Sequence, residues 1–167
     1  MFEKGDYIVY GNSGVCEVQD IGPMEMTGVS EGKLYYTLKQ RYAAGGTIFT
    51  PVDNSKIVMR SIYSKGEAGE LIETIPFIEA LEIRDEKKRE EFYKDSLRTC
   101  DFTETIRLMK LIHHRKRKRL AAGKKMASLD ERYLKMAEDG LYGELEVSLE
   151  LSRDDVEHLV AERLDAE

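Results

Sequence analysis

Residues 105–129 read TIRLMKLIHHRKRKRLAAGKKMASL, and they join an apolar helical pattern to the densest positive charge in the chain. An apolar stripe at helical spacing begins just before this segment and consists of Phe102, Ile106, Met109 and Ile112. The next positions on that face are His113 and Lys116. The pattern therefore predicts a helix that leaves its core after Ile112 and continues as a protruding end, residues 113–119, that is basic all round.

The positive segment is set against an acidic remainder. It holds no Asp or Glu, and its nine basic residues are Arg107, Lys110, Arg115, Lys116, Arg117, Lys118, Arg119, Lys124 and Lys125. The rest of the chain has 17 of the 26 Lys and Arg residues and all 32 Asp and Glu residues, so its formal charge is −15. Because such a body repels polyanions, the segment predicts a localised site for nucleic acid. A solvated helix face, a nuclear import signal and a polybasic lipid patch are the alternative interpretations.

Composition limits the class of protein. The chain has 167 residues, 41% hydrophobic and 35% charged, which predicts a soluble protein of one domain or two small ones. No apolar run approaches the ~18 residues of a membrane-spanning helix. The N-terminal residues lack the features of a signal peptide, so we expect a cytoplasmic protein. Cys16 and Cys100 are expected to be reduced.

The first sixty residues have the pattern of short strands. Glycine-containing turns separate runs of β-branched and aromatic residues, and the expected strands lie within residues 2–10, 15–21, 34–38, 47–52 and 56–59. This pattern predicts a small antiparallel β-barrel of the SH3 or Tudor kind. Pro51 cannot donate to a ladder, so its strand is expected to lie at a sheet edge, where a partner strand can add, or simply to end there.

The remaining residues have helical periodicity, with a break expected at Pro76. Asp101 is expected to cap the basic helix, and Ser152 to cap the last helix. Ser128 and Glu131 are expected to form a capping box for a long helix. We therefore predict a two-domain β + α fold, with a Tudor/SH3-like barrel over residues 1–62 and an all-α domain over residues 67–167.

No catalytic or metal-binding pattern is found in the sequence. It contains no Gly-x-x-x-x-Gly-Lys, Gly-x-Ser-x-Gly or Cys-x-x-Cys motif. His113 and His114 are adjacent, so on a helix they point about 100° apart and do not share a metal easily. We expect a binding protein without a cofactor, not an enzyme.

Several short motifs resemble those of one family. In the first half they are Gly5-Asp6-x-x-Val9-Tyr10, Ser13-Gly14-Val15, Leu34-Tyr35-Tyr36-x-Leu38, Thr50-Pro51-Val52 and Arg60. In the second half they are Leu97-x-x-x-Asp101 and Arg132-x-Leu134-x-x-Ala137-x-x-x-Leu141-x-Gly143-Glu144-Leu145. In this order the motifs resemble the CarD family of bacterial transcription regulators. The first half is also similar to the polymerase-interacting module of the transcription-repair coupling factor.

The resemblance implies a function in transcription. It implies a Tudor-like barrel that binds the β subunit of RNA polymerase, partly by strand pairing, and a helical domain that touches promoter DNA and favours the open promoter complex. The residues expected to bind the polymerase are Thr47, Ile48, Phe49 and Thr50. The residues expected to bind DNA are Lys87, Lys88, Arg89, Arg115, Lys116, Arg117, Lys118, Arg119, Lys124, Lys125 and Arg132.

The sequence departs from the family in two ways. Family members commonly wedge a tryptophan into the minor groove, but this chain has no tryptophan, and counting back from Asp101 places Glu86 near that position. The basic helix is also longer than the family leads us to expect, so charge is hypothesised to replace the wedge. Two other functions are consistent with the residues: an RNA- or ribosome-associated adaptor, and a scaffold whose basic helix docks an acidic partner.

Overall fold

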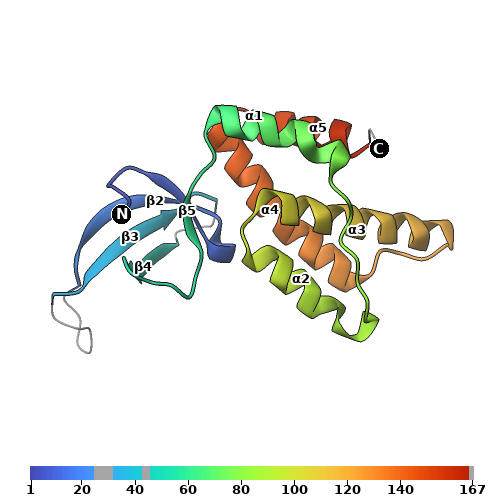
Figure 1. The fold of residues 1–167 in the computed structure, drawn as a ribbon, viewed down its shortest axis with the longest axis horizontal. Coiled ribbons are helices and arrows are strands. Elements are labelled where there is room, and N and C mark those ends of the chain that lie inside the picture. The colour runs from blue at the N-terminus through green and yellow to red at the C-terminus, as the bar shows by residue number, and fades with distance from the viewer. Residues whose placement is uncertain (25–31, 43–45, 166–167) are drawn as a thin grey trace. The chain divides into compact units, whose positions relative to one another are not determined.

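The computed structural model describes residues 1–24, 32–42 and 46–165, and Figure 1 shows the path of the chain. The chain divides into two compact units, Met1–Ile62 and Tyr63–Glu167. The first is built from strands and the second from helices, so the predicted order of a β part followed by an α part is confirmed. In the residues described, no helix is both long enough and apolar enough to span a membrane.

The first unit is an antiparallel sheet. Its five strands in the described residues are β1 (Tyr7–Tyr10), β2 (Val15–Pro23), β3 (Leu34–Gln40), β4 (Thr47–Pro51) and β5 (Met59–Ser61). They lie in the order β4-β3-β2-β1-β5, so β4 and β5 are the two ends of an open sheet. Closure of the sheet into the predicted barrel is not seen in the part of the chain that is described.

Successive side chains of a strand point to opposite faces of the sheet, and those on one face form the core of this unit. The side chains of Ile8, Tyr10, Cys16, Val18, Tyr36 and Leu38 are buried together. Burial raises the pKa of the Cys16 thiol to about 11, so this cysteine stays a neutral core residue. Gly14 follows the turn η1 (Gly11–Ser13) with φ of 74°, a conformation that favours glycine.

The fifth strand begins later than the sequence pattern predicts. The structure has β5 at Met59–Ser61, whereas the pattern predicts a strand at 56–59. A turn after β4 causes the difference: the Asn54 N–H donates to the Pro51 carbonyl at 3.1 Å, and the Lys56 N–H donates to the Asn54 side chain at 2.9 Å. These local bonds occupy backbone that would otherwise extend.

The second unit is a helical bundle. Its helices are α1 (Lys65–Thr74), α2 (Arg89–Arg98), α3 (Phe102–Ala121), α4 (Ser128–Leu149) and α5 (Arg153–Leu164), with short turns η2 (Ile75–Phe77) and η3 (Glu86–Lys88). Figure 1 shows α1 and α5 lying side by side, and the two helices are in contact. The core includes Tyr93, Ile106, Met109, Ile112, Leu145 and Val156.

The helix boundaries follow local chemistry. Asp101 accepts from the Glu104 N–H at 3.1 Å, and Ser152 accepts from the Asp155 N–H at 3.2 Å, so both predicted caps are confirmed. The predicted capping box of α4 is wrong, because Ser128 is already the first helical residue and Ala127 precedes it without a side-chain cap. The expected break at Pro76 is confirmed, since α1 ends at Thr74.

Candidate functional site

A buried carboxylate, Asp130, organises the base of the basic helix. It lies in the first turn of α4 with no exposed surface, and the Tyr93 hydroxyl donates to its Oδ1 at 2.7 Å. Arg115 Nε of α3 donates to Oδ2 at 3.0 Å, and Arg89 Nε of α2 lies 3.4 Å from Oδ1. Burial and the hydrogen bond to Asp130 raise the pKa of Tyr93, which keeps the hydroxyl protonated. The cluster ties three helices together through one buried charge.

Glu86 belongs to the same network. Arg115 Nη1 lies 3.1 and 3.3 Å from the two Glu86 carboxylate oxygens. Arg89 Nη1 also lies 3.4 Å from Glu86. This carboxylate is therefore paired with two guanidinium groups, which reduces the repulsion that a bare acid would exert on a nucleic acid.

Among the predicted DNA-binding residues, several have structural partners. Arg89 and Arg115 hold Asp130 and Glu86, with side chains only 19% and 24% exposed. Arg132 pairs with Glu90, which also accepts a hydrogen bond from the Tyr133 hydroxyl at 2.8 Å. The hydrogen bond from Tyr133 lowers the pKa of Glu90, although burial acts in the opposite direction. The charges of Lys94 and Arg132 lower this pKa further. Whether these arginines also contact DNA stays a prediction.

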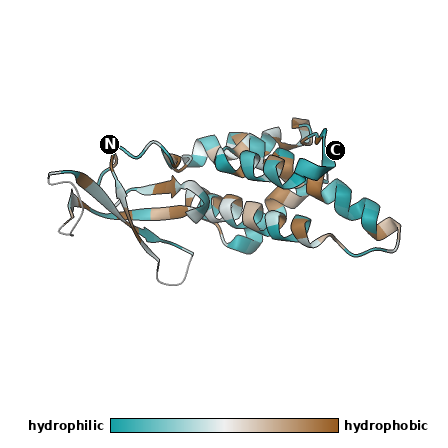
Figure 2. Ribbon diagram, turned by 90° about the horizontal axis from the view of Figure 1, so that it is seen from below, coloured by the Kyte–Doolittle hydropathy of each residue, from teal (hydrophilic) through white to brown (hydrophobic). Residues whose placement is uncertain are grey.

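Six of the other eight predicted DNA-binding residues are exposed, and two are half-buried. Arg119 is half-buried, and its Nε donates to the Lys125 carbonyl at 2.7 Å, which closes the connection between α3 and α4. Lys116 is half-buried, and the exposed cations are Lys87, Lys88, Arg117, Lys118, Lys124 and Lys125. Arg117 lies 4.0 Å from Asp165 in a solvated pair. Within the described residues none of the five exposed lysines makes an ion pair. Figure 2 shows the last turns of α3 as hydrophilic.

The point at which α3 leaves its neighbours differs from the sequence prediction. His113 and Arg115 are still half-buried, although the pattern predicts a free end from residue 113. Tertiary contacts to α4 and η3 extend the packed part by about one turn, because a guanidinium reaches a partner that an apolar pattern does not reveal. The outward-facing cations lie on the last turns of α3, on the connection to α4 and on η3.

Lys110 is not part of the exposed charge. It is 2% exposed, and its ammonium donates to the carbonyls of Ile75 and Ile78 at 2.7 and 2.5 Å. These bonds fix the turn η2, which presents Phe77 with 85% of its surface exposed. The sequence analysis predicted neither the buried position of Lys110 nor the exposed position of Phe77. The available signal was spacing, since Lys110 lies four residues after Ile106 and so shares its face.

The outer edge of β4 carries the predicted polymerase-binding residues. The Gln40 N–H donates to the Gly46 carbonyl at 3.0 Å and the Val52 N–H to the Leu34 carbonyl at 3.1 Å. In an antiparallel ladder the backbone groups alternate in direction, so those of Thr47 and Phe49 point away from β3. No strand pairs with this edge in the described part of the chain.

The four side chains of this strand divide by face. Thr47 and Phe49 are exposed, and Phe49 keeps 52% of its surface in solvent. Ile48 packs against the sheet core. Thr50 is 1% exposed, and its hydroxyl accepts hydrogen bonds from Tyr10 at 3.2 Å and Asn54 at 3.0 Å. Contact with a partner through all four side chains is therefore not expected.

Comparison with known proteins identifies the first unit. Residues 2–63 match the family model of the CarD-like/TRCF RID domain. The resemblance to the CarD family is thereby confirmed for residues 2–63. The helical residues 64–167 lie outside the match. A search of curated proteins finds no match.

Proposed function

Because residues 2–63 are a CarD-like/TRCF RID domain, we propose that this protein is a transcription regulator that joins RNA polymerase to promoter DNA. The domain match supports an RNA-polymerase-interacting, transcription-related function, and it is the observation that carries the proposal. In this proposal residues 1–62 form a Tudor-like domain that binds the polymerase β subunit. Residues 67–167 bind promoter DNA and stabilise the open complex.

The polymerase contact is proposed to form by strand addition at β4. The outward backbone groups of Thr47 and Phe49 offer a partner strand two donors and two acceptors. Pro51 has no N–H, so the added ladder ends there. Ile48 and Thr50 contribute by anchoring β4 to the sheet, while the exposed Phe49 ring supplies apolar contact.

The DNA contact is proposed to be electrostatic and largely independent of sequence. The exposed lysines on α3, on its connection to α4 and on η3 can approach phosphates without breaking an ion pair. Phosphate contacts position a protein on the duplex but carry no sequence information. The network around Asp130 holds η3 beside α3, so Lys87 and Lys88 extend the same surface.

The regulator is proposed to act by population shift, not by catalysis. A factor that binds the open promoter better than the closed one moves the equilibrium by its difference in affinity, and about 1.4 kcal/mol changes the ratio tenfold. Attachment to the polymerase raises the local concentration of the basic surface, so its own DNA affinity can be low.

Co-purification of the full chain with RNA polymerase tests the proposal. Phe49→Pro removes one outward N–H without removing a bond to β3, while Phe49→Ala removes only the ring. We expect the wild type to co-purify with the β subunit, the proline variant to lose this binding and the alanine variant to keep part of it. Equal recovery of all three proteins would rule out strand addition, and no recovery of the wild type would refute the polymerase contact.

A further inference from the structure

Glu86 lies against the two guanidinium groups that hold the buried Asp130. It is the first residue of the turn η3, and its side chain is 63% exposed. Its carboxylate accepts hydrogen bonds from Arg115 Nη1 at 3.1 and 3.3 Å and from Arg89 Nη1 at 3.4 Å. Two arginines on different helices therefore share one exposed carboxylate.

The two arginines are oriented from the inner side of this site. Arg115 Nε donates to Asp130 Oδ2 at 3.0 Å, and Arg89 Nε lies 3.4 Å from Oδ1. The Arg89 guanidinium also lies over the Tyr93 ring, 6.0 Å from the ring centroid. Because each Nε is directed inward, the Nη1 of each group faces Glu86. The outer donors are therefore positioned by contacts that do not involve Glu86.

The charges of the inner groups leave one positive charge to be matched. Arg89 and Arg115 are both charged, because guanidinium groups stay protonated in proteins, and Asp130 supplies one negative charge. Burial raises the pKa of the Tyr93 hydroxyl, so this group stays neutral. The two arginine side chains are only 19% and 24% exposed, which reduces the screening of their charge by salt. An anion at the position of Glu86 completes the site.

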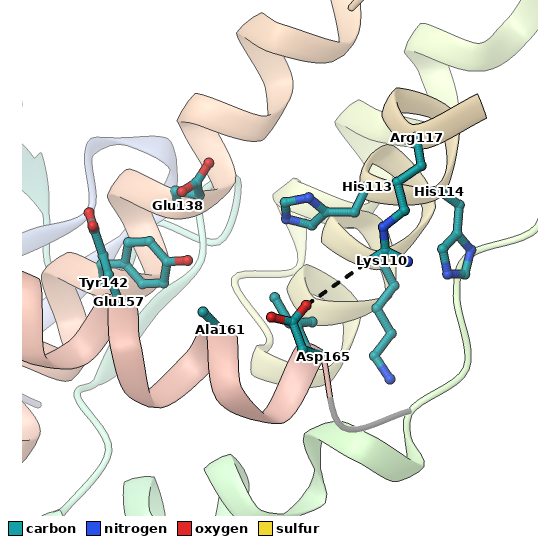
Figure 3. Close-up of a pocket in the computed structure, with 10 residues that line it drawn as sticks. Lys110, His113, His114, Arg117, Glu138, Tyr142, Glu157, Ala161 and Asp165 are labelled. Atoms are coloured by element: carbon teal, nitrogen blue, oxygen red, sulfur yellow. Dashed lines mark ion pairs between the residues drawn. The ribbon is translucent and has the colours of Figure 1, made fainter. Parts of the chain in front are cut away.

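A second acidic residue beside the basic helix has a different environment. Figure 3 shows Arg117 and Asp165 at the pocket between α3, α4 and α5, with a dashed line for their contact of 4.0 Å. Their side chains are 62% and 77% exposed, and the contact involves one guanidinium. Solvated pairs of this kind are weak. The paired, inwardly anchored arginines therefore distinguish the site at Glu86 from an ordinary surface ion pair.

The chemistry of the site suits a phosphate group. A guanidinium group presents paired N–H donors in a planar fork, which binds carboxylate and phosphate oxygens alike. The exposed Lys87 and Lys88 follow Glu86 in η3, so an approaching nucleic-acid backbone meets further positive charge. The Glu86 carboxylate is largely solvated, so it can turn into solvent without breaking a buried contact. A phosphate can then take its place.

We propose that Arg89 and Arg115 form a subsite for one phosphate of the DNA backbone, and that Glu86 closes this subsite in the free protein by occupying it. The inference rests on the proposed DNA contact of the helical unit. Because a phosphate has to displace the Glu86 carboxylate, the subsite adds little affinity for free duplex DNA. On a polymerase-bound promoter the local concentration of DNA is high, and the phosphate displaces the carboxylate.

Fluorescence anisotropy with forked duplex DNA at several salt concentrations tests the subsite. Glu86→Gln keeps the size of the side chain but removes its charge. We expect about tenfold tighter binding at low salt and a slope of log K against log salt that is steeper by about 1, because one more phosphate is neutralised. Asp165→Asn is the control, since it removes the same charge from beside an arginine of α3, and it should change the affinity by less than about twofold. Equal effects of the two substitutions would overturn the subsite.

Two further variants separate the contact from the charge. Glu86→Asp keeps the charge but shortens the side chain by one methylene, so it should close the subsite less well and tighten DNA binding about threefold. Arg115→Lys, combined with Glu86→Gln, keeps a positive charge beside Asp130 but lacks the planar fork, so it should remove most of the gain. Far-UV circular dichroism first confirms that each variant is folded. Wild-type affinity of Glu86→Asp, or an undiminished gain in the combined variant, would contradict the proposal.

The outcomes separate this inference from the proposed function. If the wild type binds DNA and Glu86→Gln binds it no more tightly, the subsite is refuted and the DNA contact stands. If neither protein binds DNA at low salt, both are refuted.

Discussion

At the scale of single residues, Asp130 shows how a charge can be structural in a protein whose proposed function also depends on charge. Its carboxylate has no exposed surface and is surrounded by Tyr93, Arg89 and Arg115. Removing one partner from a buried ion pair leaves uncompensated charge, which costs more than the pair contributes. The primary role of Arg89 and Arg115 is therefore structural, because they hold the helices together around Asp130.

Replacement of this buried carboxylate should destabilise the helical unit. We expect Asp130→Asn to lower the free energy of unfolding by about 3 kcal/mol, because Arg89 and Arg115 lose their counter-charge. Urea unfolding at neutral pH measures the change. Asp95→Asn, in the exposed pair with Arg98, is the control and should change it by less than about 0.5 kcal/mol. Equal effects of the two substitutions would contradict the structural role of Asp130.

His113 should make stability depend on pH. Its pKa is lowered in the folded protein by burial and by Lys116 and Arg117, so the unfolded chain binds the proton more readily. Stability should therefore fall as pH falls through the ordinary histidine range and below it. Unfolding measured at pH ~7.5 and ~5.5 should show a smaller loss for His113→Gln than for the wild type.

The exposed His158 provides the control for that experiment. His158→Gln should lose as much stability on acidification as the wild type does. If His113→Gln and the wild type lost the same amount, the titration of His113 would not contribute to stability in this pH range.

At the scale of elements, α3 combines a buried stripe with an outward-facing basic end. Its apolar positions pack in the helical core, and the exposed charge is concentrated after Arg115. Counterion release makes binding to DNA depend on salt in proportion to the number of phosphates neutralised. If the basic end of α3 contacts DNA, neutralising it should therefore change the slope of log K against log salt.

Neutralising that end should reduce the salt dependence of DNA binding. We expect Lys118→Gln, Lys124→Gln and Lys125→Gln combined to reduce the slope of log K against log salt by about 2 to 3 for forked duplex DNA. The control combines Lys4→Gln, Lys56→Gln and Lys65→Gln, which have the same charge change and exposed positions. Fluorescence anisotropy measures both, and an equal reduction would show that net charge, not this surface, determines binding.

Local sequence predicts the elements better than their tertiary partners. Alternation and turn residues predict four strands near their observed places, but the turn tied by Asn54 displaces β5. Asp101 and Ser152 are recognisable caps because their partners lie three residues away. The division of the cations was not predictable, because Arg115 meets Asp130 and Glu86 through tertiary folding alone. Periodicity does not specify strand order, but Pro51 favours an edge position for its strand, and β4 is an end strand of the sheet.

At the scale of the whole molecule, the chain joins a domain of polymerase-interacting type to a helical unit with a localised cationic surface. The proposed function needs both on one chain. In that proposal, binding to the polymerase would supply proximity, and weak phosphate contacts would then favour the open promoter. Loss of either contact should therefore remove the effect even if the other contact is intact.

The lifetime of the open promoter complex after addition of a polyanionic competitor tests this central claim most directly. The account predicts that the wild-type protein lengthens the lifetime, and that Phe49→Pro and the combined Lys118, Lys124 and Lys125 variant each abolish the lengthening. If both variants lengthened the lifetime as much as the wild type, or the wild type had no effect, the account would be contradicted.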